Sequence, residues 1–103
     1  MDKEAIVGLV KEYAEAVRKN FRVKKVILFG SHVRGTARED SDIDVAVVLK
    51  NVEEDFLVSG AKLFRLRREI DARIEPVLLE ETNDESGFLE EILKTGEIIY
   101  SAD

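Results

Sequence analysis

The segment 26–48 constrains what this chain can fold into more than any other stretch. Its first four residues are all apolar, which is typical of a strand buried on both faces, and they end at Gly30 and Ser31. A polar, turn-forming stretch follows, and then Asp42 and Asp44 stand at the head of a second apolar run. Two acids so close together repel each other and need cations beside them. Carboxylates suited to a metal and a glycine turn suited to a phosphate, this close in sequence, indicate metal-assisted chemistry on a nucleotide.

The bulk composition narrows the class of protein. The chain has 103 residues, enough for one modest core, and we expect a single domain over 1–103. Its net charge of −6 argues against broad affinity for nucleic acids, although Mg²⁺ could supply the positive charge that a nucleotide needs. Cysteine is absent, which excludes a disulfide framework. The charged start, with no long apolar run after it, predicts no secretory signal and no membrane span, so we expect a cytoplasmic protein.

Hydrophobic periodicity places the expected elements along the chain. It predicts helices over 3–19, 31–34 and 53–69, and strands over 23–29, 42–49 and 70–79. A last helix is marked by apolar residues from Phe88 to Leu93 and is closed by Gly96. Tyr13 is expected at the edge of the core, and the apolar tail 98–100 is expected to dock on the sheet or on another chain. Pro76 cannot donate to a strand ladder, so the third strand should be an edge strand or bulged. This order predicts one α/β (α+β) domain, a small mixed β-sheet with helices packed against it.

Asp42 and Asp44 are the strongest candidates for binding a metal. They stand two residues apart on one predicted strand, so both carboxylates face the same side. Hard divalent cations prefer oxygen ligands, and two ions about 3.5–4 Å apart need carboxylates that both ions share. Two acids at alternate strand positions can supply such a bridge. The alternative is a polar strand start at the surface, because the Asp-x-Asp pattern is common by chance.

The turn after the first strand offers a site for a phosphate. Gly30 lets the backbone approach a ligand closely, and Ser31 opens a short helix whose N-terminal N–H groups favour anions. The alternative is an ordinary strand-to-helix turn. Arg34 could bind a phosphate, or it could form a structural ion pair with Asp40 or Asp42.

Two further polar residues are weaker candidates. Asp71 opens the third predicted strand, and its surroundings alone favour a capping acid paired with Arg68 or Arg73 over a metal ligand. His32 has no second histidine in the chain to act with. We expect its side chain to be exposed and without a role in the site.

In combination these residues form a recognisable pattern. Gly30-Ser31 ends one strand, Arg34-Gly35 lies in the gap, and Ser41-Asp42-Ile43-Asp44 opens the next apolar run. This order of motifs resembles the signature of the DNA polymerase β-like nucleotidyltransferase superfamily. A chain of this length, with nothing appended to the motif-bearing domain, resembles the minimal nucleotidyltransferase (MNT) branch of that superfamily, of the HEPN/MNT antitoxin type.

The resemblance implies a third carboxylate on a later strand. The stretch that contains Asp71, Arg73 and Pro76 is similar to the part of polymerase β that carries this group, with the acid, the arginine and the proline at the same spacing. This similarity assigns the third carboxylate to Asp71. Glu75 lies on the same predicted face, further along the strand, and is the alternative.

The resemblance also implies a reaction. Two Mg²⁺ ions are expected, one on the triphosphate of a nucleotide such as ATP and one on an acceptor hydroxyl that attacks the α-phosphorus. The expected site residues are Asp42, Asp44 and Asp71 for metal binding and catalysis, and Gly30, Ser31 and Arg34 for nucleotide binding.

The acceptor is the least constrained part of this expectation. Larger relatives carry an acceptor-binding domain for which this chain has no room, so the acceptor should be met by a partner chain, a symmetric copy or an open face. The resemblance implies a small all-helical HEPN protein as partner, in a toxin–antitoxin pair whose antitoxin transfers AMP to a tyrosine of the toxin. Two alternatives stay open, a non-catalytic module that neutralises a HEPN partner by binding, and transfer to a small molecule such as an aminoglycoside.

Overall fold

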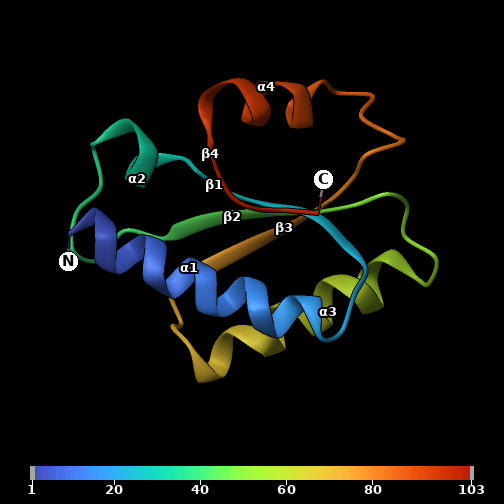
Figure 1. Cartoon of the computed structure of the whole chain (residues 1–103), viewed down its shortest axis with the longest axis horizontal. Helices are drawn as coiled ribbons and strands as arrows, with labels where there is room; N and C mark the ends of the chain where they lie inside the picture. The colour runs from blue at the N-terminus through green and yellow to red at the C-terminus, as the bar shows by residue number, and fades with distance from the viewer. Residues whose placement is uncertain (1, 103) are drawn as a thin grey trace.

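The computed structural model of the chain describes residues 2–102. In chain order its elements are α1 (Lys3–Arg18), β1 (Val23–Phe29), α2 (Ser31–Arg34), β2 (Ile43–Leu49), α3 (Phe56–Leu66), the 3₁₀ turn η1 (Arg67–Glu69), β3 (Ile74–Glu80), α4 (Phe88–Thr95) and β4 (Glu97–Ser101) (Figure 1). Asp2 caps α1 by accepting a hydrogen bond from the backbone N–H of Ala5. Within this described range, the helices are all too short or too polar to cross a membrane.

The strands form one mixed sheet in the order β3-β2-β1-β4. β1 pairs antiparallel with both β2 and β4, whereas β2 pairs parallel with β3, so α3 and η1 form the crossover between them. The register places Phe29 beside Asp44, and Asp44 beside Glu75. β3, which contains Pro76, is an edge strand, as the missing N–H of that proline predicts. The predicted α/β fold with a small mixed sheet is confirmed.

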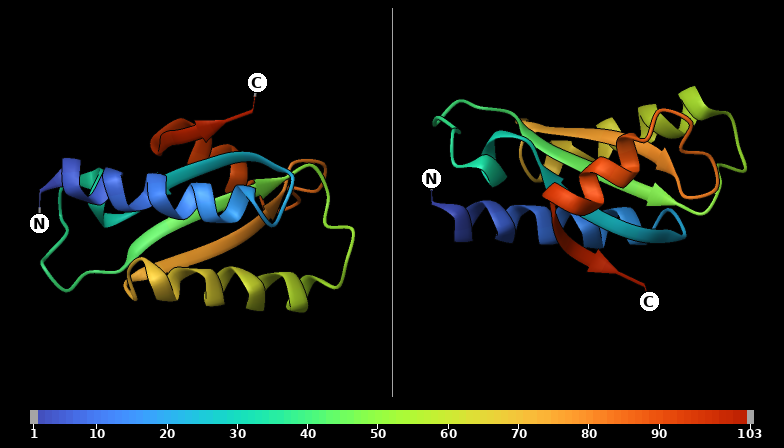
Figure 2. Two further views of the ribbon diagram at one scale, coloured as in Figure 1. Left: turned by 60° about the horizontal axis from the view of Figure 1, so that its bottom comes forward. Right: turned by 90° about the horizontal axis from the view of Figure 1, so that it is seen from above.

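The two faces of the sheet carry different helices (Figures 1 and 2). β2 sends Val45 and Val47 into the larger core, which it shares with α1 and α3, and sends Ala46 and Val48 into a smaller core under α4. Successive residues of a strand point to opposite faces, so Asp44 lies on the same face as Ala46. The acidic end of β2 therefore opens on the α4 side of the sheet.

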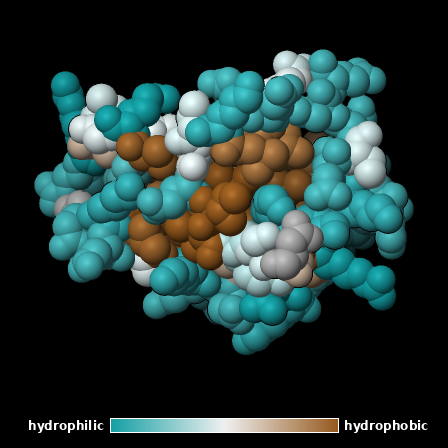
Figure 3. All heavy atoms as spheres, turned by 45° about the horizontal axis from the view of Figure 1, so that its top comes forward, coloured by the Kyte–Doolittle hydropathy of each residue, from teal (hydrophilic) through white to brown (hydrophobic). Residues whose placement is uncertain are grey.

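Apolar side chains remain at the surface on the α4 side. Figure 3 shows a continuous hydrophobic area there. Phe88, Leu93 and Ile98, which belong to α4 and β4, are each between 40% and 48% exposed. Phe88 also packs edge-to-face on Phe29, with ring centroids 5.7 Å apart. An apolar surface thus adjoins the end of β1 that leads into Gly30.

The predicted starts of β2, α3 and β3 were wrong, and the apolar tail docks at one of its two expected places. β2 begins at Ile43, so Asp42 precedes the strand instead of opening it. α3 begins at Phe56 rather than at residue 53, because the Asp55 side chain caps it. β3 begins at Ile74 rather than at residue 70. The N–H groups of Ile70 and Asp71 bond back to the carbonyl of Arg67, which makes a turn where a strand was predicted. The tail docks on the sheet as β4, beside β1.

Tyr13 links α1 to α3 inside the larger core. Its side chain is fully buried, deeper than predicted, and its hydroxyl donates a 2.7 Å hydrogen bond to the carbonyl oxygen of Leu63. Burial raises the pKa of the Tyr13 phenol above its ordinary value, because the charged phenolate would lose its hydration. The phenol therefore acts as a neutral donor that satisfies a buried acceptor.

We expect Tyr13→Phe to lower the free energy of unfolding by about 1–2 kcal/mol, because the ring stays while the Leu63 carbonyl loses a partner. Urea denaturation followed by circular dichroism measures this loss. Tyr100→Phe is the matched control. Tyr100 is half-buried on an edge strand, and its contact with the Arg18 guanidinium, 4.3 Å from the ring centroid, needs only the ring. Equal losses in the two variants would contradict the role of the Tyr13 hydroxyl.

Candidate active site

The candidate site lies where β1 ends and β2 begins. Asp44 is the second residue of β2, and in the sheet it stands between Phe29 of β1 and Glu75 of β3. Asp42 lies just before β2 with an exposed side chain, whereas the side chain of Asp44 is half-buried. The charge of Asp42 acts on Asp44, so the structure brings the two predicted carboxylates near each other.

Gly30 lies against the Asp44 carboxylate. Its φ of 80° is in the region that favours glycine, and it stands between β1 and α2. A Cβ at this position would fall 3.1 Å from Cγ of Asp44 and still closer to Oδ2. Residue 30 must therefore be glycine both for its backbone angle and for the space that the carboxylate occupies.

The surroundings of Asp44 disfavour its charged form. Burial is the largest cause that raises the pKa of this carboxyl, followed by the negative charges of Asp42 and Glu75. The positive charges of Arg34 and His32 lower the pKa again, but by less. A cation beside Asp44 would offset this repulsion and lower the free energy of the ionised carboxylate.

Asp71 and Glu75 differ in their relation to Asp44. Asp71 lies in the turn before β3, so its predicted place on the strand was wrong. It accepts hydrogen bonds from the Arg73 backbone N at 2.8 Å, from Nε at 3.0 Å and from Nη2 at 2.7 Å. Hydrogen bonds from the Arg73 side chain hold the pKa of Asp71 below its ordinary value. Glu75 is instead the neighbour of Asp44 in the parallel register.

The turn after Gly30 places the two other predicted residues at the site. α2 starts directly at Ser31, and the N–H groups of Val33 and Arg34 both donate to the Gly30 carbonyl at 3.1 Å. Arg34 is exposed, and its charge acts on Asp44. Within residues 2–102 Arg34 forms no ion pair, so the alternative pairing with Asp40 or Asp42 is absent there.

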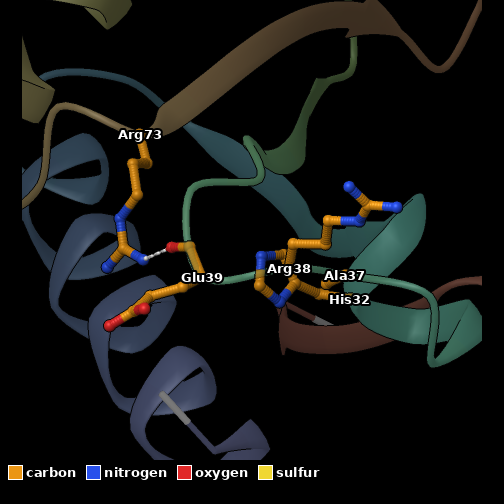
Figure 4. A pocket seen from close by; sticks show the side chains of 5 residues that line it. All are labelled: His32, Ala37, Arg38, Glu39 and Arg73. Carbon is orange, nitrogen blue, oxygen red and sulfur yellow. Dashed lines mark hydrogen bonds between the residues drawn. The ribbon is translucent and has the colours of Figure 1, made fainter.

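His32 differs from the prediction of an exposed, incidental side chain. It is half-buried, and its Nε2 atom is buried without a hydrogen-bond partner among the described residues. A hollow of about 370 Å³ lies beside it and is lined by His32, Ala37, Arg38, Glu39 and Arg73, whose side chains are drawn in Figure 4. In it the Nη1 atom of Arg73 donates a 3.0 Å hydrogen bond to the Glu39 carbonyl. The sequence held no signal for this position, because a single histidine has no spacing that could point to it.

The donor set fits a divalent cation that is also bound by a ligand. Across residues 2–102, no group of three or more Asp, Glu, His or Cys side chains converges closely enough to hold an ion alone. Asp42 and Asp44 can supply two oxygen ligands, and Mg²⁺ commonly completes its shell with phosphate oxygens and water. The raised pKa of Asp44 supports this interpretation, because a cation beside the carboxylates relieves their repulsion.

The chain matches a known protein family over most of its length. The model of the family "Polymerase beta, Nucleotidyltransferase" matches residues 11–103. The chain belongs to this family. A Methanocaldococcus jannaschii protein named "Putative protein adenylyltransferase" is 32% identical over 95 residues, which cover 88% of this chain and 94% of that protein. The protein adenylyltransferase MntA of Thermococcus cleftensis is 29% identical, over 94% of this chain and 93% of that protein.

Solved structures of nucleotidyltransferases share the fold. The crystal structure of a "putative nucleotidyltransferase" from Sulfolobus solfataricus has a TM-score of 0.72 at 25% identity, covering 97% of this chain and 84% of that one. A toxin–antitoxin crystal structure with AMP-PNP has a TM-score of 0.68 at 20% identity, covering 90% of this chain and 74% of that one. The chain is thus a nucleotidyltransferase of the minimal type, related to proteins named as protein adenylyltransferases.

We expect Asp44→Asn to raise the melting temperature of the metal-free protein at neutral pH. Because the folded state raises the pKa of Asp44, folding is penalised once the pH exceeds the pKa of this group in the unfolded chain. The penalty is complete above the folded-state pKa. The advantage of the variant should therefore shrink as the pH falls and vanish where both states are protonated.

Thermal melts in EDTA at several pH values measure this difference. Asp55→Asn is the matched control, because Asn caps a helix as well as Asp does and Asp55 lies far from the site along the chain. A stabilisation by Asp44→Asn that grew toward low pH would contradict the repulsion at the site.

Proposed function

We propose that the protein transfers AMP from ATP to a hydroxyl group of a partner protein, in a reaction that depends on Mg²⁺. The observation that carries this proposal is the Asp44 carboxylate, packed against Gly30 and crowded by Asp42 and Glu75. Family membership and the protein adenylyltransferases among its relatives support the same reaction. Crowded acids beside a glycine turn suit a substrate that brings both phosphates and cations.

The proposed site residues fall into two groups, one that binds the cations and one that binds the phosphates of the nucleotide. Asp42 and Asp44 would hold the cations, and Gly30 and Ser31 would hold the β- and γ-phosphates through the turn at the start of α2. Arg34 adds positive charge beside the same phosphates. When bound, Mg²⁺ would polarise the phosphates and lower the pKa of the acceptor hydroxyl. The acceptor oxygen forms a bond to the α-phosphorus as the bond to pyrophosphate breaks.

We favour Glu75 over Asp71 as the third carboxylate. Glu75 stands beside Asp44 in the register, and its charge acts on Asp44. Asp71 is held by three hydrogen bonds from Arg73 in the turn before β3, which leaves its charge compensated. Among the described residues Glu75 meets only the Nη1 atom of Arg67, at 3.4 Å, so it is held less tightly than Asp71 and is better placed to take the proton of the acceptor hydroxyl.

The partner that we propose is a HEPN toxin, with this chain as its antitoxin. The support is the shared fold with a toxin–antitoxin structure crystallised with AMP-PNP. The apolar surface on the α4 side, where Phe88 packs on Phe29, adjoins the carboxylates and offers a place for such a partner. The second candidate function is neutralisation of the toxin by binding alone. It predicts that the toxin is neutralised although no AMP adduct forms.

We expect Asp42→Asn and Asp44→Asn to lower AMP transfer to the HEPN partner by at least about a hundredfold, because the groups that stabilise charge in the transition state are lost. Mass spectrometry of the partner after incubation with ATP and Mg²⁺ measures the adduct. Asp40→Asn, in the exposed loop before the site, is the matched control and should keep the rate.

A thermal shift tests the site without the partner. Stabilisation of the wild type should require ATP and Mg²⁺ together and should be lost in Asp42→Ala. If no adduct forms while Asp42→Ala still neutralises the partner fully, the protein acts by binding and the proposed transfer is wrong.

The two candidate third carboxylates give opposite results. We expect Glu75→Gln to lower transfer by at least about a hundredfold while the melting temperature stays close to that of the wild type. We expect Asp71→Asn to lower the melting temperature, since the charge-assisted bonds to Arg73 weaken, while most of the transfer rate remains. If Asp71→Asn lost transfer while Glu75→Gln kept a normal rate, Asp71 would be the third carboxylate.

A further inference from the structure

α3 carries apolar side chains on its outer face as well as on its inner face. Ser59 and Leu63 point inward and are buried. The large apolar side chains on the outside are Phe56, Leu57, Val58 and Phe64, with exposed fractions of 50%, 82%, 47% and 41%. Figure 2 shows α3 at the rim of the molecule. A helix that packs on one core normally presents polar residues to water, so the fold of one copy leaves this outer face unexplained.

Gly60 lies in the middle of the outer face. It follows Leu57 by one turn and precedes Phe64 by another, with Ala61 beside it. A Cβ at Gly60 would meet nothing within 4 Å. Glycine inside a helix destabilises it relative to alanine, and packing within one copy gives no reason for it. Two small residues between two large ones leave a place where another helix can approach closely.

The charges at the two ends of α3 are opposite. Glu53 and Asp55 stand at the N-terminal end, and Arg65 and Arg68 stand at the C-terminal end. Within residues 2–102, Glu53, Arg65 and Arg68 take no part in an ion pair. A second α3 in the antiparallel direction would set the acids of one helix against the arginines of the other. The two helix dipoles would oppose each other favourably as well.

We propose that the outer face of α3 pairs with the same face of a second copy, in an antiparallel dimer with two-fold symmetry. With the axis between Gly60 and Ala61, Leu57 lies opposite Phe64 of the second copy, and the end of α3 next to Glu53 lies beside the end next to Arg68. Every such contact occurs twice, as a two-fold interface requires. The sequence of α3 is thus complementary to itself in size and in charge.

A hollow at the C-terminal end of α3 fits this arrangement. It has a volume of about 290 Å³ and is lined by Phe64, Arg65, Arg67, Arg68 and Ala72. In the antiparallel register, Phe56 and Leu57 of the second copy enter it. The carboxylates open on the other face of the sheet, under α4, so both active sites stay accessible in the dimer.

Sedimentation equilibrium of the full chain at micromolar concentrations, with Gly60→Leu and Gly8→Leu compared with the wild type, tests the proposal. Gly8 also lies inside a helix and is exposed, and a Cβ added there would meet nothing within 4 Å, so both changes should strengthen their helices equally. We expect a wild-type dimer, an at least tenfold weaker dimer for Gly60→Leu, and less than a twofold change for Gly8→Leu. A monomeric wild type, or equal dimer affinity for both variants, would overturn the proposal.

A charge exchange tests the direction of the two helices. Glu53→Arg should weaken the dimer at low salt, because it places two arginines opposite each other. Adding Arg68→Glu in the same chain should restore the affinity, since each pair then has the opposite polarity. Circular dichroism confirms that the variants are folded. A double variant that is as weak as the single one would show that these ends do not meet.

Discussion

The antiparallel pairing of β1 with β2 is the constraint on which the site depends. It sets Phe29 opposite Asp44, and the chain then turns at Gly30 directly over the Asp44 carboxylate. The same pairing aligns the end of one strand with the start of the next, so the Gly30 turn and the Asp44 carboxylate meet. Arg34 and Asp42 lie between these two positions in the chain, so the same pairing also keeps them close to Asp44.

The parallel pairing of β2 with β3 adds the non-local part of the site. It brings Glu75 beside Asp44, although the whole of α3 lies between them in the chain. The pKa of Asp44 is raised first by burial and then by the negative charges of Asp42 and Glu75. The fold therefore holds the Asp44 carboxylate where its negative charge is disfavoured.

The sequence alone predicted those parts of the structure that depend on residues close together in the chain. The apolar run before Gly30 and the alternation after Asp44 predicted both central strands, and the missing N–H of Pro76 predicted an edge strand. The turn around Asp71 was not predicted, because period-two spacing from Ile70 onward matches a strand as well as it matches a turn. What decides between them is a set of hydrogen bonds to Arg67 and Arg73, which depend on where the end of α3 lies.

Arg67 lies between the outer face of α3 and the acidic edge of the sheet. Its guanidinium stacks on Phe64, 4.7 Å from the ring centroid, and its Nη1 atom donates to the carbonyls of Ala72 at 2.8 Å and Ile74 at 2.9 Å. The same atom lies 3.4 Å from Oε1 of Glu75. A single side chain thus touches both an exposed aromatic ring and a carboxylate of the site. Phe64 and Glu75 therefore share the Arg67 guanidinium as a neighbour, and a group that covers Phe64 also lies against the arginine that pairs with Glu75.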